Sequence, residues 1–122
     1  MATVLTNAGK AITTNRIKGA GTEPVYVAWG TGAGTAAAAD TTLFTESAES
    51  RTSGTSTQQT TTVTNDTYQV VGTITATAGR TITNAGLFDA ATVGNLYVKG
   101  DFTGVVLSTN DSIQFTIKCA YA

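Results

Sequence analysis

The sequence contains no histidine, one cysteine (Cys119) and one proline. The absence of histidine excludes a serine–histidine–aspartate triad and removes the commonest protein ligand of transition metals. A single cysteine can form neither an internal disulfide nor a cysteine metal cluster. The acidic residues are scattered, without the close spacing of a calcium loop or any sign of a carboxylate pair in a cleft. We therefore expect no catalytic centre, no metal and no cofactor, and the composition argues against an enzyme.

Charge is scarce as well. Only 12% of the residues are charged, about half the usual globular share, and seven basic and eight acidic residues leave a net charge of −1. A chain without basic excess is not expected to bind nucleic acid electrostatically. The longest apolar runs are residues 25–29 and the four alanines of residues 36–39, both too short to span a membrane, and residues 1–10 do not resemble a signal peptide. Neither nucleic acid, nor a membrane, nor a small-molecule substrate is an expected partner.

Threonine is abundant instead, with 27 of the 122 positions. A chain of this length forms one domain, so residues 1–122 are expected to make a single β-rich unit. Residues 3–18 are its one plausible helix. Apolar residues there recur near the helical period, Thr3 or Thr6 is a candidate N-cap, and Gly19 and Gly21 follow.

The remaining chain predicts strands. Residues 25–29 are β-branched and aromatic, and Trp29 is expected to lie in the core. Leu43 and Phe44 are expected to anchor a loop onto the core. Beyond residue 67, we predict a turn at Ala78–Gly79, a bulge at Ala85–Gly86 and a strand that Gly104 ends.

Two later strands have predicted faces. The strand over residues 96–102 is expected to place Leu96, Val98 and Phe102 on one face. The last strand alternates most cleanly, with an inward set of Ile113, Phe115, Ile117, Cys119 and Tyr121. The Cys119 thiol is therefore predicted to be buried and inert. The fold class predicted is an antiparallel β-sandwich or small barrel with a short N-terminal helix and an extended polar β-ribbon or loop.

That polar ribbon is the segment of residues 46–65, where Val63 is the only large apolar residue. It is either an exposed β-ribbon, since threonine favours strands, or a mobile loop in the isolated subunit. Glu46, Glu49 and Arg51 near its start are interpreted as a solvated polar edge. An uncharged threonine-rich face is equally consistent with a solvated surface and with an assembly surface.

Other motifs favour structural roles. The glycine-rich stretch of residues 30–34 lacks the third glycine of a dinucleotide fingerprint and the lysine of a phosphate loop, so it is expected to be a turn. Asp89, Asp101 and Asp111 are interpreted as turn residues.

Four stretches of the chain, taken together, resemble small virion proteins of tailed bacteriophages. They are VYVAWGTG (residues 25–32), DTTLFTE (40–46), TYQVVGTI (67–74) and ITNAGLFD (82–89), and the similarity extends over roughly residues 3–118. The resemblance implies a virion structural protein and carries no catalytic residues. Because no internal repeat or heptad pattern is present, a compact capsid decoration (cement) subunit is favoured over a fibre.

A cement subunit would act on the virion surface after assembly in the host cytoplasm. The resemblance implies the major capsid protein of the same phage as its partner, together with other copies of itself in a homotrimer. Residues 3–18 and the polar ribbon are the segments expected to become ordered on assembly. The candidate interface residues are Arg51, Thr52, Thr55, Thr57, Gln58, Gln59, Thr60, Thr61 and Thr62.

The alternative is a tail, neck or fibre adaptor that binds a receptor or a glycan. In that case, Trp29, Tyr68 and Tyr97 are the candidate contact aromatics.

Overall fold

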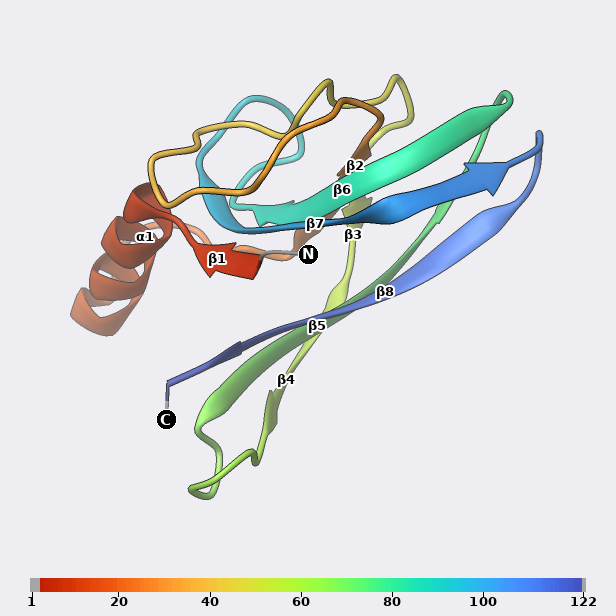
Figure 1. The fold of residues 1–122 in the computed structure, drawn as a ribbon. Coiled ribbons are helices and arrows are strands. Elements are labelled where there is room, and N and C mark those ends of the chain that lie inside the picture. Colours follow the sequence, from red (N-terminus) through yellow and green to blue (C-terminus); the bar gives the residue numbers. More distant parts are fainter. Residues whose placement is uncertain (1–2, 122) are drawn as a thin grey trace.

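The computed structural model describes residues 3–121, which form two antiparallel sheets and one helix (Figure 1). The elements are β1 (Thr3–Leu5), α1 (Asn7–Lys18), β2 (Tyr26–Gly30), β3 (Thr52–Ser53), β4 (Thr55–Gln59), β5 (Thr67–Thr75), β6 (Arg80–Phe88), β7 (Leu96–Leu107) and β8 (Ser112–Ala120). The larger sheet has the order β1-β7-β6-β2-β3 and the smaller has the order β4-β5-β8. The chain is mainly β, and the described residues form no closed barrel, so the predicted sandwich is confirmed.

One long β-hairpin, folded over itself, builds most of both sheets. In the smaller sheet Thr75 of β5 lies opposite Ser112 of β8, and in the larger sheet Arg80 of β6 lies opposite Leu107 of β7. Between these pairs both arms of the hairpin bend. The Ala76 backbone N–H still donates a 2.8 Å hydrogen bond to the Asp111 carbonyl across the bend. Figure 1 shows the two bends together, where β5 passes into β6 and β7 into β8. The predicted turn at Ala78–Gly79 is one of these bends.

The predicted bulge at Ala85–Gly86 is wrong, because both residues pair regularly, with Gly100 and Lys99. The first irregularity lies between Ile82 and Asn84. Ile82 and Leu87 are an odd number of residues apart and both contribute to the core between the sheets, which a regular strand does not allow. The irregularity thus keeps both residues in that core.

The predicted strand end at Gly104 is also wrong, since β7 continues to Leu107. Residues 102–104 lie opposite the single residue Thr83 and are an irregular stretch within the strand. A second irregularity pairs Leu87 with Val98 but Phe88 with Leu96. Leu96 therefore faces away from Val98 and Phe102 and does not share their face as predicted.

Two clusters of apolar side chains stabilise the fold. The cluster between the sheets includes Trp29, 1% exposed, which confirms its predicted core position. The other lies on the outer side of the larger sheet and consists of Ala28, Leu43, Phe88 and Leu96. Leu43 thus anchors the outer loop (residues 31–45), as predicted. Phe44 beside it is half-buried, and its ring centroid lies 3.2 Å from the Nζ of Lys99.

Lys99 also fastens the outer loop. Its side chain, 1% exposed, donates to Asp40 Oδ2 at 3.0 Å and to the Thr42 carbonyl at 2.9 Å. Hydrogen bonds from the Ala37 backbone and from Lys99 lower the pKa of Asp40 below its usual 3.8. The buried ammonium is therefore paired and satisfied, as a buried charge must be.

The helix ends where predicted but begins later, because residues 3–5 form the strand β1 and only Asn7–Lys18 are helical. Thr6 is the N-cap, accepting a 2.9 Å hydrogen bond from the Gly9 backbone, and Gly19 ends the helix in a left-handed conformation with φ of 88°. The short strand β1 precedes α1 and pairs with β7. The N-terminal segment is thus folded against its own sheet. No helix in the described part of the chain is long and apolar enough to cross a membrane.

The alternation of β8 is confirmed, but its inward side chains are less buried than predicted. Ile113, Phe115, Ile117 and Cys119 are all partly exposed, and half of Tyr121 is exposed. The reason is that β8 is the edge strand of the smaller sheet and pairs only with β5. The expected burial of the Cys119 thiol is therefore only partial.

Candidate functional site

The polar ribbon is an ordered edge of the molecule. It crosses from β3 in the larger sheet to β4 in the smaller one at Gly54, and β4 pairs with β5 over its whole length. Gly54 is required there because a Cβ would lie 2.4 Å from a methyl group of Val70. Of the two predicted alternatives for residues 46–65, the structure has the β-ribbon, with strands over residues 52–59 and a turn after them.

Most of the predicted interface residues lie along this edge. The side chains of Thr55, Thr57, Gln58, Thr60, Thr61 and Thr62 are exposed, and Gln59 is half-buried. The ribbon and its turn project from the lower end of the sandwich in Figure 1. The structure thus brings seven of the nine candidates together along one edge, although Gln58 lies on the opposite face of β4 from Thr55 and Thr57 and is directed toward Tyr68.

Arg51 and Thr52 are oriented toward their own chain. The Arg51 side chain, 7% exposed, forms two hydrogen bonds to the Glu46 carboxylate and donates to the carbonyls of Ala90 and Val93. Its guanidinium carbon also lies 3.5 Å from the centroid of the Phe88 ring. Thr52 donates to the Thr73 carbonyl at 3.0 Å. Arg51 therefore fastens two loops together and has little side-chain surface left for a partner.

Glu49 is a central contact that the sequence analysis misassigned to a solvated edge. Its side chain is 3% exposed, and its carboxylate accepts hydrogen bonds from Trp29, Ser47, Thr77 and Arg80. Burial alone would raise the pKa of Glu49. Hydrogen bonds to the carboxylate outweigh this effect and lower the pKa far below 4.5, and their donors are Ser47, the Thr77 backbone, Trp29 and the Thr77 hydroxyl. The carboxylate therefore joins the ribbon to the core and to the bend between β5 and β6.

A sequence signal for this contact exists. Glu46, Glu49 and Arg51 are the only charged residues between positions 46 and 65. Opposite charges grouped in an otherwise uncharged segment indicate internal pairing as well as a solvated edge.

The turn at the tip of the ribbon is held by Asp66. Its carboxylate accepts hydrogen bonds of 2.8–2.9 Å from the backbones of Thr61, Thr62 and Val63. The backbone bonds of Val63, Thr61 and Thr62 are also what lower the pKa of Asp66 well below 3.8. The turn therefore has a defined shape, and it presents Val63 to solvent with 64% of its surface exposed.

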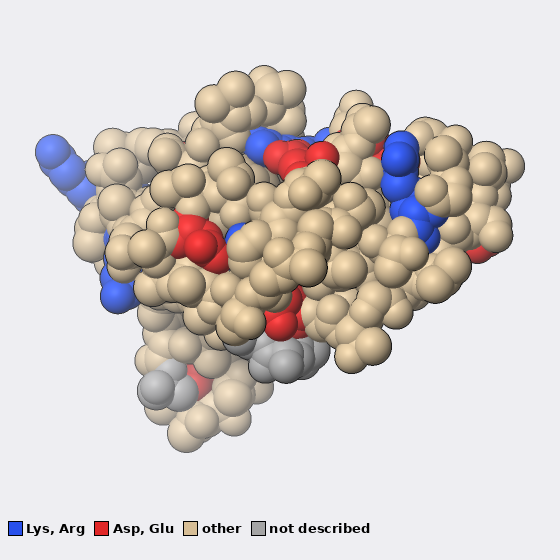
Figure 2. All heavy atoms as spheres, turned by 45° about the horizontal axis from the view of Figure 1, so that its top comes forward, with Lys and Arg blue, Asp and Glu red and all other residues tan. Residues whose placement is uncertain are grey.

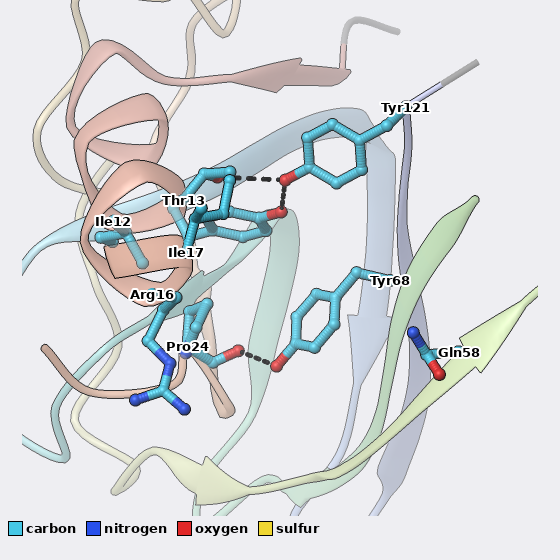
Figure 3. Close-up of a pocket in the computed structure, with 9 residues that line it drawn as sticks. Ile12, Thr13, Arg16, Ile17, Pro24, Gln58, Tyr68 and Tyr121 are labelled. Atoms are coloured by element: carbon cyan, nitrogen blue, oxygen red, sulfur yellow. Dashed lines mark hydrogen bonds between the residues drawn. The ribbon is translucent and has the colours of Figure 1, made fainter. Parts of the chain in front are cut away.

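A second candidate site is the tyrosine pocket, a cavity of about 510 Å³ between α1 and the smaller sheet (Figure 3). Its lining residues are Ile12, Thr13, Arg16, Ile17, Pro24, Gln58, Tyr68, Tyr97 and Tyr121. The rings of Tyr68 and Tyr97 meet edge to face with centroids 5.8 Å apart. The pocket has the volume of a small-ligand site, with apolar walls and several hydroxyl groups.

The tyrosine hydroxyls are already engaged in hydrogen bonds. Tyr68 donates to the Pro24 carbonyl at 2.9 Å, the Tyr97 and Tyr121 hydroxyls contact each other, and Thr13 lies 3.1 Å from the Tyr121 oxygen. Burial is the main factor that raises the pKa of all three tyrosines above 10. The pocket is thus pre-formed and lined by neutral side chains apart from Arg16, and the nearby Glu23 carboxylate, after burial, also raises the pKa of Tyr68.

The aromatic set predicted for a receptor or glycan contact is divided by the structure. Tyr68 and Tyr97 line the pocket together, whereas Trp29 lies in the core, where its ring packs edge to face against Phe115 at a centroid distance of 6.3 Å. Tyr121 takes the third aromatic position, although the sequence analysis treated it only as an inward residue of the last strand.

The remaining motifs have structural roles. Gly32 in the glycine-rich stretch belongs to the outer loop and donates to the Phe44 carbonyl, and no helix follows it. Asp89 and Asp111 accept backbone hydrogen bonds in turns, as predicted, but Asp101 lies within β7 and accepts from the Ala36 backbone at 2.7 Å. Among residues 3–121, no group of three acidic, cysteine or histidine side chains is placed to hold a metal ion.

Few charges interrupt the surface. On the face shown in Figure 2, acidic and basic side chains form small separate groups between large uncharged areas.

Comparison of the chain with protein-family models, with curated proteins and with solved structures gave no significant match. The functional assignment therefore rests on the surfaces described above and on the sequence resemblance.

Proposed function

We propose that the protein is a structural subunit of a tailed-bacteriophage virion, a decoration (cement) protein that binds the outer capsid lattice and stabilises the shell. It assembles in the host cytoplasm, contacts the major capsid protein, and acts by adding contacts between capsid subunits without any chemical step. The resemblance described for residues 25–32, 40–46, 67–74 and 82–89 supports the virion role. The homotrimer is a further part of the proposal and rests on that resemblance.

The observation that carries the proposal is the exposed edge of the polar ribbon. Here β4 presents unpaired backbone groups beside uncharged threonine and glutamine side chains, and the Asp66-ordered turn extends the same surface. Glu23, bound to Ser56 of β4, is a charged group at this edge. An ordered edge with few charges is suited to a permanent contact, because binding requires few charged groups to lose their hydration.

The alternative is a tail, neck or fibre adaptor that binds a receptor or a glycan. The tyrosine pocket is the specific observation in its favour, because aromatic rings and hydroxyls together suit a ligand with apolar and polar faces. The two functions predict different locations of the protein in the virion. They also predict that different parts of the chain contact the partner, the ribbon in one case and the tyrosine pocket in the other.

Electron microscopy of virions labelled with an antibody against this chain tests the proposal first. Label on the head supports the cement role, and label confined to the tail supports the adaptor. A second measurement is binding to capsids stripped of decoration protein, followed by the temperature at which those capsids release DNA.

The surface itself is tested with the double variant Thr55→Glu/Thr62→Glu, whose side chains are exposed on the ribbon. Its matched control is Thr103→Glu/Thr109→Glu, with the same change of charge at exposed positions in and after β7, away from the ribbon. We expect the first variant to lose capsid binding and shell protection and the control to keep both. Equal binding by both variants would remove the ribbon from the interface.

A further inference from the structure

The two sheets differ in how their edges are protected against pairing with another chain. The larger sheet ends in β1, with three residues, and β3, with two. The smaller sheet ends in β4, with five residues, and β8, with nine. Short edge strands are one way in which proteins prevent unwanted strand addition. In the larger sheet, β1 also leaves residues 101–107 of β7 unpaired on that side, but the irregular stretch at residues 102–104 interrupts this edge. The smaller sheet therefore has the regular edges that a second chain can extend over a useful length.

β8 is the less protected of these two edges. All nine of its residues pair with β5 without a register shift, so no bulge bends the strand away. It contains no proline, and Lys118 is its only charged residue. A long, regular and nearly uncharged edge strand is a template for pairing unless something covers it.

The side chains of β8 also leave apolar surface uncovered. Ile113, Phe115 and Ile117 face the larger sheet and remain partly exposed. Beside them, a groove of about 210 Å³ opens between β8 and β7, with Val98, Phe102, Phe115 and Ile117 in its lining. A strand added to β8 will cover this groove if it carries apolar residues at alternate positions on the same face.

We propose that this strand is β8 of a second copy, paired antiparallel about a two-fold axis. Within the chain, β8 has the required alternation, whereas the corresponding face of β4 presents Ser56 and Gln58 opposite Val70 and Tyr68. The contact joins two three-stranded sheets into one of six strands. It is isologous, so each copy supplies the same surface.

The charge of Lys118 indicates the register. With Thr116 on the two-fold axis, all nine residues pair, Phe115 lies opposite Ile117 of the second copy, and Lys118 lies opposite Gln114. With Lys118 on the axis, two lysines would oppose each other directly, which is unfavourable. The Thr116-centred register therefore combines the longest pairing with apolar matches and no like-charge pair.

This contact deepens the self-association included in the proposed function, but it uses β8 and leaves the β4 ribbon free. A three-fold or capsid contact through β4 can coexist with it. The tests below are made on the purified protein without capsids, so their failure is distinguishable from a failure of the cement role.

The first test is a cysteine reporter at the proposed axis. In a Cys119→Ser background, Thr116→Cys places two thiols directly opposite each other, at a Cβ separation of about 5 Å that a disulfide can close with a small adjustment. Gln114→Cys in the same background is the matched control, since its two copies would lie about 13 Å apart along the strands. We expect mild oxidation to convert most of the Thr116 variant, but not the Gln114 variant, to a covalent dimer.

The second test uses charge and light scattering. The unmodified protein is expected at twice the chain mass of 12.4 kDa. Thr116→Lys should raise the dissociation constant roughly tenfold, because it sets like charges directly opposite at the axis. Thr73→Lys, exposed on the central strand β5, adds the same charge away from the edge and should leave the dimer intact.

Several results would overturn the pairing. They are a monomeric mass for the unmodified protein, equal cross-linking of the Thr116 and Gln114 variants, and equal dissociation by Thr116→Lys and Thr73→Lys. A Thr57→Cys variant in the Cys119→Ser background reports on β4. A covalent dimer from that variant, with none from Thr116→Cys, would move self-association to the ribbon.

Discussion

The indole nitrogen of Trp29 donates a 2.9 Å hydrogen bond to the carboxylate of Glu49, which joins the largest buried side chain to the polar ribbon. The same carboxylate binds Thr77 and Arg80 at the bend of the folded hairpin. A segment without apolar anchors is thus fixed by a buried charge. The ribbon has its shape before any partner binds, which lowers the entropy that assembly must overcome.

Glu49→Gln should lower the free energy of unfolding at pH 7 by about 2 kcal/mol, because the hydrogen bonds to the charged group are weakened and Arg80 loses its ion pair. Glu46→Gln is the matched control. Its side chain is 31% exposed, so its loss should be below about 1 kcal/mol. Urea unfolding followed by tryptophan fluorescence measures both variants. Equal losses would contradict the central role of Glu49.

The same residue makes stability depend on acid pH. Since the pKa of Glu49 is lower in the folded chain than its ordinary 4.5, its contribution is complete above pH 4.5 and is lost as the pH falls below that value. The Glu49→Gln variant should therefore lose less stability than the unmodified protein between neutral pH and pH 3. The measurement is the free energy of unfolding across this range. Parallel curves for the two proteins would contradict the assignment.

Gly9→Ala should destabilise the protein, although the exchange usually strengthens a helix. A Cβ at position 9 would lie 2.1 Å from the Tyr97 carbonyl oxygen, so α1 would have to move away from β7. We expect a loss of about 2 kcal/mol. Gly79→Ala is the control, because its Cβ would meet only the Leu107 carbonyl oxygen, at 3.8 Å. Thermal unfolding of the two variants should show a clear decrease for Gly9→Ala alone.

The sequence predicted features that depend on neighbouring residues. The alternation of β8, the Thr6 cap and the end of α1 at Gly19 are local patterns, and each is confirmed. The irregularities in β6 and β7 were misplaced, because their positions depend on the partner strand. Gly104 illustrates this, since glycine is typical of strand ends as well as of irregular stretches within strands.

The candidate sites were harder to predict for the same reason. Glu49 resembles a solvated residue until Trp29, Thr77 and Arg80 are brought to it from other parts of the chain. Tyr68, Tyr97 and Tyr121 come from separate strands or strand ends and meet only in the folded chain. The ribbon threonines, by contrast, are adjacent in sequence, and an exposed β-ribbon was one of the two alternatives that composition predicted for them.

Phe115→Ala measures how much strand β8 contributes to the apolar core within a single copy of the chain. A fully buried phenylalanine costs about 3–5 kcal/mol on truncation, and Phe115 is only partly buried, so we expect about 2 kcal/mol. Leu87→Ala, at a side chain 1% exposed, should cost at least as much despite removing fewer atoms. Unfolding at a protein concentration where the chain is monomeric isolates this contribution. A negligible loss for Phe115→Ala would contradict the packing of β8 against the core.

Alkaline pH should destabilise the protein through the tyrosine pocket. The pKa values of Tyr97 and Tyr121 are raised above 10 in the folded chain, chiefly because burial disfavours the phenolate. Their contribution to stability is therefore complete below pH 10 and is lost as the pH rises above 10, where the unfolded chain ionises first.

Tyr97→Phe removes one of these groups. It should cost about 1 kcal/mol at pH 7 through the lost hydrogen bond, and then show a shallower decline above pH 10. The free energy of unfolding in urea, measured from pH 7 to pH 11, tests both parts. A decline as steep as that of the unmodified protein would show that the Tyr97 hydroxyl is accessible to water in the folded chain, and the pocket would then be open around that group.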